Sequence, residues 1–135
     1  MQAIVIDDSR IFRDRVFIAL SELAIFGTIL LATGPAEANA LLKSTKFDFV
    51  VLDLHMPDAD GIYRTSGLDV LKAIKSESNP SHVIVMSNFS EAPYRTRCQR
   101  LGADGFLDKS TEFMQLQDVT RSLLAGHTPF AGDSA

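Results

Sequence analysis

The sequence predicts one α/β domain with a doubly wound, five-stranded parallel sheet and helices on both faces. Short apolar runs alternate along the chain with longer segments whose apolar residues recur at helical spacing. The run 49–52 is apolar at every position, which favours a strand buried on both faces, as in a parallel sheet. A repeated strand–helix order implies right-handed crossovers, and these place helices on both sides of the sheet.

Five apolar runs are the expected strands. They are residues 3–6, 28–32, 49–52, 83–86 and 105–107. Residues typical of turns separate them from the preceding helical segments, such as Gly27 before the second run and Gly102 before the fifth. The fold class therefore follows from the order of the segments.

The segments after these runs are the expected helices. They cover 9–23, a stretch that begins at Gly34-Pro35, 66–76, 90–101 and 110–124. Ser9 or Asp8 is a suitable N-cap for the first helix, and Ser110 or Thr111 for the last. Residues 54–61 are expected to form a loop because they are rich in Pro, Asp and Gly. We expect the domain to cover residues 1–125 and a short, small-residue tail to occupy 126–135.

The bulk composition favours a soluble cytoplasmic protein. A chain of 135 residues can bury one hydrophobic core, and its net charge of −4 does not favour nucleic-acid binding. The single cysteine, Cys98, cannot form an internal disulfide, and the first ten residues lack the basic region of a secretory signal. No apolar stretch approaches the ~20 residues that a membrane helix needs. We therefore expect binding neither to membranes nor directly to nucleic acid.

Polar side chains follow four of the predicted strands at the point where each strand ends. Asp7 and Asp8 follow the first, Asp53 the third, Ser87 the fourth and Lys109 the fifth. In an open parallel sheet these ends line one crevice, where such folds bind ligands. Three carboxylates, a hydroxyl and an amine together suggest a divalent cation and a phosphoryl group.

These residues carry a resemblance to the receiver domain of bacterial response regulators, in particular to stand-alone, chemotaxis-regulator-like receivers of two-component signalling. The matching segments run from the first strand to the last helix: Ile6-Asp7-Asp8-Ser9, Val51-Leu52-Asp53-Leu54-His55-Met56-Pro57, Asp60-Gly61, Val85-Met86-Ser87 and Gly102-Ala103-Asp104-Gly105-Phe106-Leu107-Asp108-Lys109. The resemblance implies a flavodoxin-like (βα)5 fold and a signalling phosphoacceptor. It does not imply a metabolic enzyme, because a receiver catalyses only its own phosphorylation and dephosphorylation.

The resemblance also implies a role for individual residues. Asp53 would be the phosphoacceptor. Mg²⁺ would be held by the carboxylates of Asp8 and Asp53, by the backbone carbonyl of His55, and by Asp7 through a bound water. The cation, as a hard ion, suits such oxygen ligands.

The remaining implied roles belong to the response to phosphorylation. Ser87 would hydrogen-bond the attached phosphoryl group, and Lys109 would pair with it. Phe106 matches the aromatic position that turns inward on activation. Phosphorylation of this kind can bias a two-state surface.

The expected partners are proteins. A histidine kinase or phosphotransfer protein would supply the phosphoryl group, and a downstream protein would bind the output surface at about residues 90–124. Arg95, Arg97 and Arg100 give this region a basic face. A DNA target is less expected, because 135 residues leave no room for an attached DNA-binding domain. Receivers often pair through this surface, so a homodimer is also compatible with the sequence.

Three features depart from the usual receiver pattern. Residues 62–67 are inserted before Leu68, either as a tolerated surface insertion or as a lip in which Tyr63 and Arg64 contact the site or a partner. Ser110 replaces the usual proline after Lys109, so we expect a trans bond there, since a cis non-proline bond costs about 3–4 kcal/mol. Bulky Asn88 and Phe89, with His55, predict an altered rate of phosphoaspartate hydrolysis.

Other functions fit the sequence less well. A haloacid-dehalogenase-type phosphatase needs a second acid two residues after its nucleophile, where this chain has His55. A flavodoxin-like cofactor binder would need a phosphate-cradling loop after the first strand, where Asp7 and Asp8 would repel phosphate. The runner-up is a receiver-like interaction module that works without phosphorylation.

Overall fold

The fold is seen in a computed structural model, which describes residues 1–57, 60–89 and 92–127. In this part of the chain five parallel strands form one sheet in the order β2-β1-β3-β6-β7. The strands are β1 (Gln2–Ile6), β2 (Thr28–Ala32), β3 (Phe49–Asp53), β6 (His82–Ser87) and β7 (Gly105–Asp108). The predicted α/β fold class is therefore confirmed.

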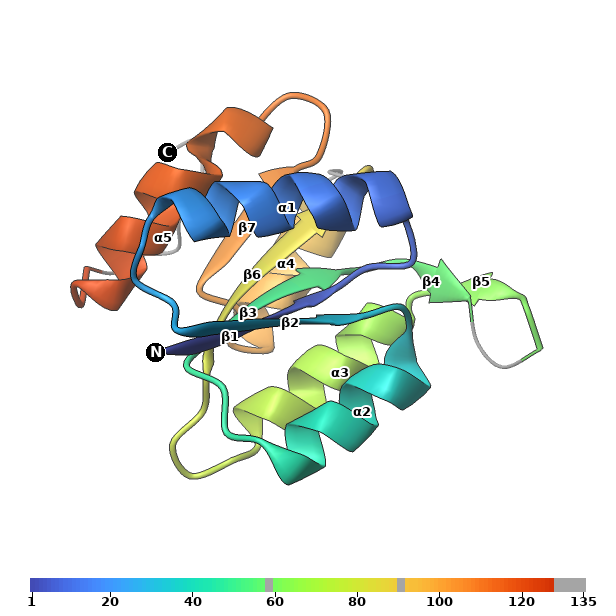
Figure 1. The fold of residues 1–135 in the computed structure, drawn as a ribbon. Coiled ribbons are helices and arrows are strands. Elements are labelled where there is room, and N and C mark those ends of the chain that lie inside the picture. Colours follow the sequence, from blue (N-terminus) through green and yellow to red (C-terminus); the bar gives the residue numbers. More distant parts are fainter. Residues whose placement is uncertain (58–59, 90–91, 128–135) are drawn as a thin grey trace.

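Helices cover both faces of the sheet, as Figure 1 shows. They are α1 (Arg10–Glu22), α2 (Pro35–Ser44), α3 (Ser66–Lys75), α4 (Ala92–Arg100) and α5 (Leu116–Leu124). α1 and α5 pack on one face, whereas α2, α3 and α4 pack on the other. Ser9 caps α1 as expected, since its Oγ accepts a hydrogen bond of 3.3 Å from the N–H of Phe12.

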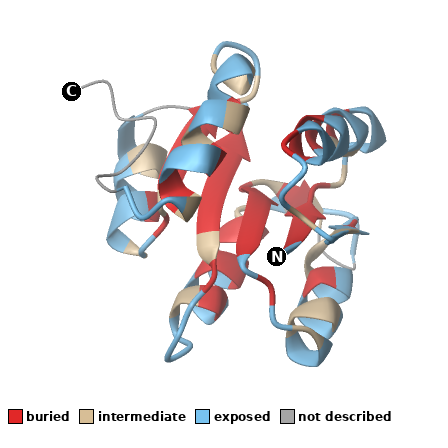
Figure 2. Cartoon of the chain, turned by 60° about the vertical axis from the view of Figure 1, so that its left-hand side comes forward, coloured by how far each residue is buried: buried red, intermediate tan, exposed pale blue. Residues whose placement is uncertain are grey.

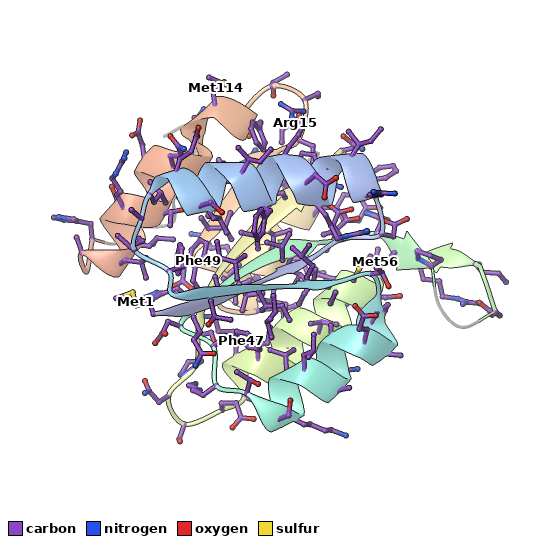
Figure 3. The ribbon with its side chains drawn as sticks, viewed as in Figure 1. Met1, Arg15, Phe47, Phe49, Met56 and Met114 are labelled. Carbon is purple, nitrogen blue, oxygen red and sulfur yellow. The ribbon has the colours of Figure 1, made fainter. Side chains whose placement is uncertain are left out.

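The core consists of two layers separated by the sheet. Alternate strand residues point to opposite faces, so Ile4 and Ile6 join the α2–α3–α4 layer while Ala3 and Val5 join the α1–α5 layer. Phe49 and Phe47 likewise lie on opposite sides of the sheet (Figure 3). Figure 2 shows the strands buried between half-exposed helices. This is the physical reason why β3 has no polar residue before Asp53.

The expected loop after β3 contains a small hairpin instead. β4 (Met56–Pro57) and β5 (Tyr63–Arg64) pair antiparallel and project from the body beside the carboxyl ends of the strands (Figure 1). Met56 is fully buried and anchors the base. Residues 58–59 lie outside the described part. Strands of two residues are too short to show a period in the sequence, so composition alone suggested a loop.

The prediction for the last helix was also wrong in its start. A 3₁₀ turn, η1 (Phe113–Gln115), precedes α5, and neither Ser110 nor Thr111 caps a helix. Instead, Oδ1 of Asp108 accepts hydrogen bonds from the N–H groups of Ser110 and Thr111 and from the Ser110 hydroxyl. An aspartate that captures nearby backbone donors favours a turn over a helix.

Three further expectations concern the Lys109–Ser110 peptide bond, membrane-spanning helices and the bounds of two segments. The described chain has no cis peptide bond, so the Lys109–Ser110 bond is trans as expected. Within the described residues no helix combines the length and apolar character needed to cross a membrane. The expected start of α4 at 90–91 and all but the first two residues of the expected tail at 126–135 lie outside the described residues.

Candidate functional site

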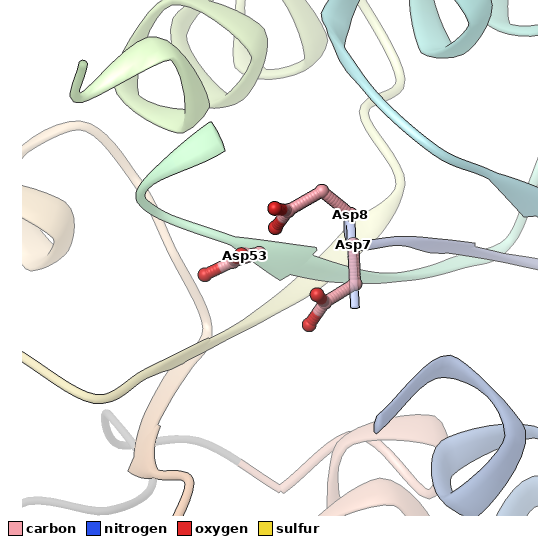
Figure 4. A group of neighbouring side chains, drawn as sticks. All are labelled: Asp7, Asp8 and Asp53. Carbon is pink, nitrogen blue, oxygen red and sulfur yellow. The ribbon is translucent and has the colours of Figure 1, made fainter. Parts of the chain in front are cut away.

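Three carboxylates meet at the carboxyl edge of the sheet. Asp7 and Asp8 follow β1, and Asp53 is the last residue of the neighbouring β3, so the parallel register of these two strands brings them together. One oxygen from each lies within 4.8 Å of the others (Figure 4). Asp7 and Asp53 are buried, whereas Asp8 is half-buried.

Backbone and helix contacts fix Asp7. Its Oδ1 accepts a hydrogen bond of 2.8 Å from the N–H of Ser9, the N-cap of α1. Its carbonyl oxygen accepts a bond of 2.9 Å from Nη1 of Arg13, one turn into the same helix. The start of α1 therefore determines where this carboxylate lies.

Lys109 reaches the cluster from the loop after β7. Its Nζ lies 2.7 Å from Oδ2 of Asp7 and 3.5 Å from Oδ2 of Asp53. The ammonium also lies 4.4 Å from the ring centroid of Phe12. The Lys109 side chain is only 9% exposed, so its charge acts in a partly desolvated environment where electrostatic interactions are strong.

Ser87 and Phe106 are buried residues of β6 and β7. Ser87 is fully buried at the end of β6, and its Oγ accepts a 2.9 Å hydrogen bond from the N–H of Phe89. Phe106 on β7 is fully buried too, so its ring already lies inside in this structure. The guanidinium of Arg95 lies over that ring, 4.8 Å from its centroid.

Burial is the main cause of the raised pKa of Asp53, and repulsion from the neighbouring carboxylates adds to it. Burial raises the pKa of Asp53 to about 8, and the nearby charges of Asp7 and Asp8 raise it as well, although Lys109 opposes them. A carboxylate cluster with one positive side chain is thus short of positive charge. The three potential metal ligands are carboxylate oxygens, which fit a hard divalent cation such as Mg²⁺.

The cluster opens into a small cavity of about 250 Å³. It is lined by Asp8, Ser9, Asp53, His55, Asn88, Phe89 and Lys109. The rings of His55 and Phe89 lie 4.1 Å apart between centroids, and the Tyr94 ring meets His55 edge-on at 5.3 Å. The rings of His55 and Phe89 therefore line part of the cavity through which a phosphoryl donor would approach Asp53.

The structure brings Asp7, Asp8, Asp53, His55 and Lys109 together at one edge of the sheet. Ser87 and Phe106 are fully buried and do not line the cavity, and several neighbours of the site were not predicted from the sequence. Tyr94 and Arg95 come from α4, outside the quoted motifs, and Glu112 follows Lys109 closely in the loop before α5. Helical spacing alone gave no indication of them, because α4 is polar on most of its surface. The sequence predicts the basic face formed by the arginines of α4, but it does not predict the contact of Arg95 with Phe106.

Comparison with known families identifies the family to which this site belongs. The family model described as "Response regulator receiver domain" matches residues 3–121. The chain belongs to the response-regulator receiver family. A signalling role in two-component systems follows from this membership.

Individual relatives agree with the family. The receiver is 31% identical over 131 residues to the transcriptional regulatory protein FixJ of Bradyrhizobium diazoefficiens, and 27% identical over 131 residues to the Fimbriae Z protein of Salmonella typhimurium. Each alignment covers 97% of this chain, which spans 60% of the length of either relative.

Solved receiver domains share the fold. The signal receiver domain of a DNA-binding response regulator (merR) from Colwellia psychrerythraea superposes with a TM-score of 0.79 at 28% identity, covering 93% of this chain and 98% of that one. The receiver domain of the putative response regulator NarL from Mycobacterium tuberculosis gives a TM-score of 0.78 at 28% identity, covering 93% and 97%.

Proposed function

We propose that this receiver accepts a phosphoryl group on Asp53 from a histidine kinase or phosphotransfer protein and passes the signal to a protein target. The observation that carries the proposal is the meeting of Asp53 with Asp7, Asp8 and Lys109 beside an open cavity. A nucleophilic carboxylate, a cation site and a fixed ammonium are the parts that phosphoryl transfer to aspartate needs.

In the proposed reaction a carboxylate oxygen of Asp53 attacks phosphorus, and the bond from phosphorus to the donor histidine nitrogen breaks. Lys109 would move from between the two carboxylates to offset charge on the transferred group. Ser87 accepts a hydrogen bond from Phe89 through its oxygen, so its own O–H is available to donate to a phosphoryl oxygen.

Mg²⁺ is the proposed cofactor. Asp8 and Asp53 would hold it directly, the carbonyl oxygen of His55 would complete the protein ligands, and Asp7 would act through a water molecule. When bound, the cation offsets the negative charge of the carboxylates and of the phosphoryl oxygens.

The proposed output surface covers residues of about 90–124. Arg97 and Arg100 on α4 are exposed there, which favours a protein with a complementary acidic face. A second copy of the receiver is the alternative occupant. We also propose that the 135-residue chain acts as a stand-alone regulator. It should then take up the phosphoryl group without any other segment.

Incubation with acetyl phosphate tests the proposal. Intact mass should show a gain of one phosphoryl group with Mg²⁺, much less without it, and none in Asp53→Asn. No gain in a folded receiver that binds Mg²⁺ would contradict the proposal. That result would favour an interaction module that works without phosphorylation.

A further inference from the structure

One carboxylate joins the loop of Lys109 to helix α4. Oε1 of Glu112 accepts a 2.8 Å hydrogen bond from the backbone N–H of Asp108, the residue directly before Lys109. The same oxygen lies 3.0 Å from Nη2 of Arg95 on α4. The position of Arg95 therefore affects where the Glu112 carboxylate lies, and through it the backbone of Asp108.

Arg95 is itself fixed by β7. Its Nη1 donates a 2.9 Å hydrogen bond to the carbonyl oxygen of Phe106, and its guanidinium covers the Phe106 ring. The side chains of Arg95 and Glu112 are 21% and 20% exposed, so the pair is better shielded from solvent than an ordinary surface ion pair. Such a pair has a defined geometry that can position its neighbours.

Hydrogen bonds to the backbone hold the loop on both sides of Lys109. On one side, Glu112 holds the N–H of Asp108; on the other, Oδ1 of Asp108 holds the N–H of Ser110. The N–H of Lys109 itself donates a 2.9 Å hydrogen bond to the carbonyl oxygen of Ser87. The ammonium can lie between Asp7 and Asp53 only if this backbone stays in place.

We infer that Arg95 and Glu112 are positioning residues for Lys109, and that they link the position of α4 to the chemistry at Asp53. The inference rests on the proposed phosphorylation of Asp53. Neither side chain lines the cavity around Asp53, so both act through the Lys109 loop. Since Arg95 belongs to the proposed output helix, the ion pair gives that helix a direct connection to the site.

A matched ion pair elsewhere provides the control. Nζ of Lys75 on α3 lies 2.8 Å from Oδ2 of Asp104, with side chains 14% and 18% exposed. Asp104 accepts a hydrogen bond from the N–H of Val83, so this pair also holds a strand, but at the opposite end of the sheet. Lys75→Ala should therefore reduce stability much as Arg95→Ala does, without disturbing Lys109.

The first experiment measures the rate of phosphorylation by acetyl phosphate at saturating Mg²⁺. Arg95→Ala should lower the rate roughly tenfold, because small displacements of a catalytic group are costly, and Lys75→Ala should change it less than about twofold. In a Lys109→Ala background, Arg95→Ala should have less than about a twofold further effect, as expected when two residues act through one group. The exchanged pair Arg95→Glu/Glu112→Arg should not recover the lost rate. A guanidinium at position 112 cannot accept the hydrogen bond from the N–H of Asp108, and a carboxylate at position 95 cannot donate to the carbonyl oxygen of Phe106.

Equal rates in Arg95→Ala and Lys75→Ala, or an undiminished effect of Arg95→Ala without Lys109, would overturn the inference. A second measurement does not depend on phosphorylation. Amide hydrogen exchange of Lys109 and Asp108 should be faster in Arg95→Ala and Glu112→Gln than in Lys75→Ala. Unchanged exchange overturns the positioning role, whereas a wild-type chain that takes up no phosphoryl group overturns only the proposed function.

Discussion

Asp53 lies where burial and two neighbouring carboxylates oppose its ionisation, and this has a consequence for stability. Its pKa of about 8 in the folded protein exceeds the usual 3.8 of an aspartate in an unfolded chain. The folded protein thus binds this proton more tightly, so the contribution of Asp53 to stability is lost as pH rises from about 4 through about 8.

The first prediction is that Asp53→Asn stabilises the metal-free protein. Because the amide carries no charge, the variant should exceed the wild type in unfolding free energy by on the order of a few kcal/mol at pH 8 and by much less at pH 5. Thermal unfolding in EDTA across this pH range measures the difference. Mg²⁺ should remove most of it at pH 8, and parallel pH curves for the two proteins would contradict the account.

The second prediction concerns Phe89. Its ring is 45% exposed and lies against His55 at the cavity of Asp53, so we expect it to restrict the approach of water. Phe89→Ala should shorten the lifetime of the phosphorylated form several-fold, with smaller changes in His55→Ala and Asn88→Ala. The decay of phosphorylated protein, followed by intact mass, tests this.

The control for Phe89 is Ile18→Ala. Ile18 is 57% exposed on α1 and does not line the cavity, so its loss removes a comparable exposed apolar group without opening the site. A lifetime that stays the same in all three site variants would show that these side chains do not control hydrolysis.

Single residues differed in how well the sequence predicted them. Asp7, Asp53 and Lys109 were predictable because each directly follows a strand, and parallel strands place such residues at one edge. The inward position of Phe106 and its contact with Arg95 were not, since both depend on side-chain packing between β7 and α4. Local spacing carries no information about such contacts.

At the scale of elements, α3 approaches β3 more closely than any side chain would allow. A Cβ on Gly67 would overlap the carbonyl oxygen of Asp53 and lie 2.8 Å from Cα of Leu54. The N–H of Gly67 instead donates a 3.0 Å hydrogen bond to the carbonyl oxygen of Leu54. Residues 66 and 67 belong both to the expected insertion at 62–67 and to the expected helix at 66–76. The structure confirms the helix, since Ser66 and Gly67 are buried parts of α3.

The third prediction is that Gly67→Ala destabilises the receiver by about 2–3 kcal/mol, because backbone atoms must move to admit the methyl group. The shift would displace Asp53 and lower its phosphorylation rate. Gly27→Ala is the control, since its Cβ would meet nothing within 4 Å, and its effect should stay within about 0.5 kcal/mol. Chemical denaturation measures both, and equal stabilities of the two variants would refute the close-packing argument.

The sequence predicted long elements better than short ones. All five strands of the main sheet and the body of each helix follow from apolar periodicity, which reports burial directly. The β4–β5 hairpin and the 3₁₀ turn before α5 are set by hydrogen bonds of single side chains, such as the exposed Arg64–Asp60 pair at 3.1 Å and the Asp108 turn. Competing local bonds of this kind leave no periodic pattern.

At the scale of the molecule, the buried two-layer core fixes the site. Strands covered on both faces place the ends of β1, β3, β6 and β7 at one edge. Asp53 and Ser87 are the last residues of their strands, and the pair Asp7-Asp8 and the residue Lys109 directly follow theirs. Cys98 belongs to this core: it is fully buried, and burial raises the pKa of its thiol to about 11. It is therefore a packing residue.

The central claim is that Asp53, among the three clustered carboxylates, takes the phosphoryl group. The most direct measurement is reduction of the phosphorylated protein with borohydride, which converts an aspartyl phosphate to homoserine, followed by peptide mass mapping. We expect homoserine at position 53 after treatment with acetyl phosphate and Mg²⁺, with Asp7 and Asp8 unchanged. Homoserine at Asp7 or Asp8, or at no position in a folded, Mg²⁺-bound receiver, would contradict the account.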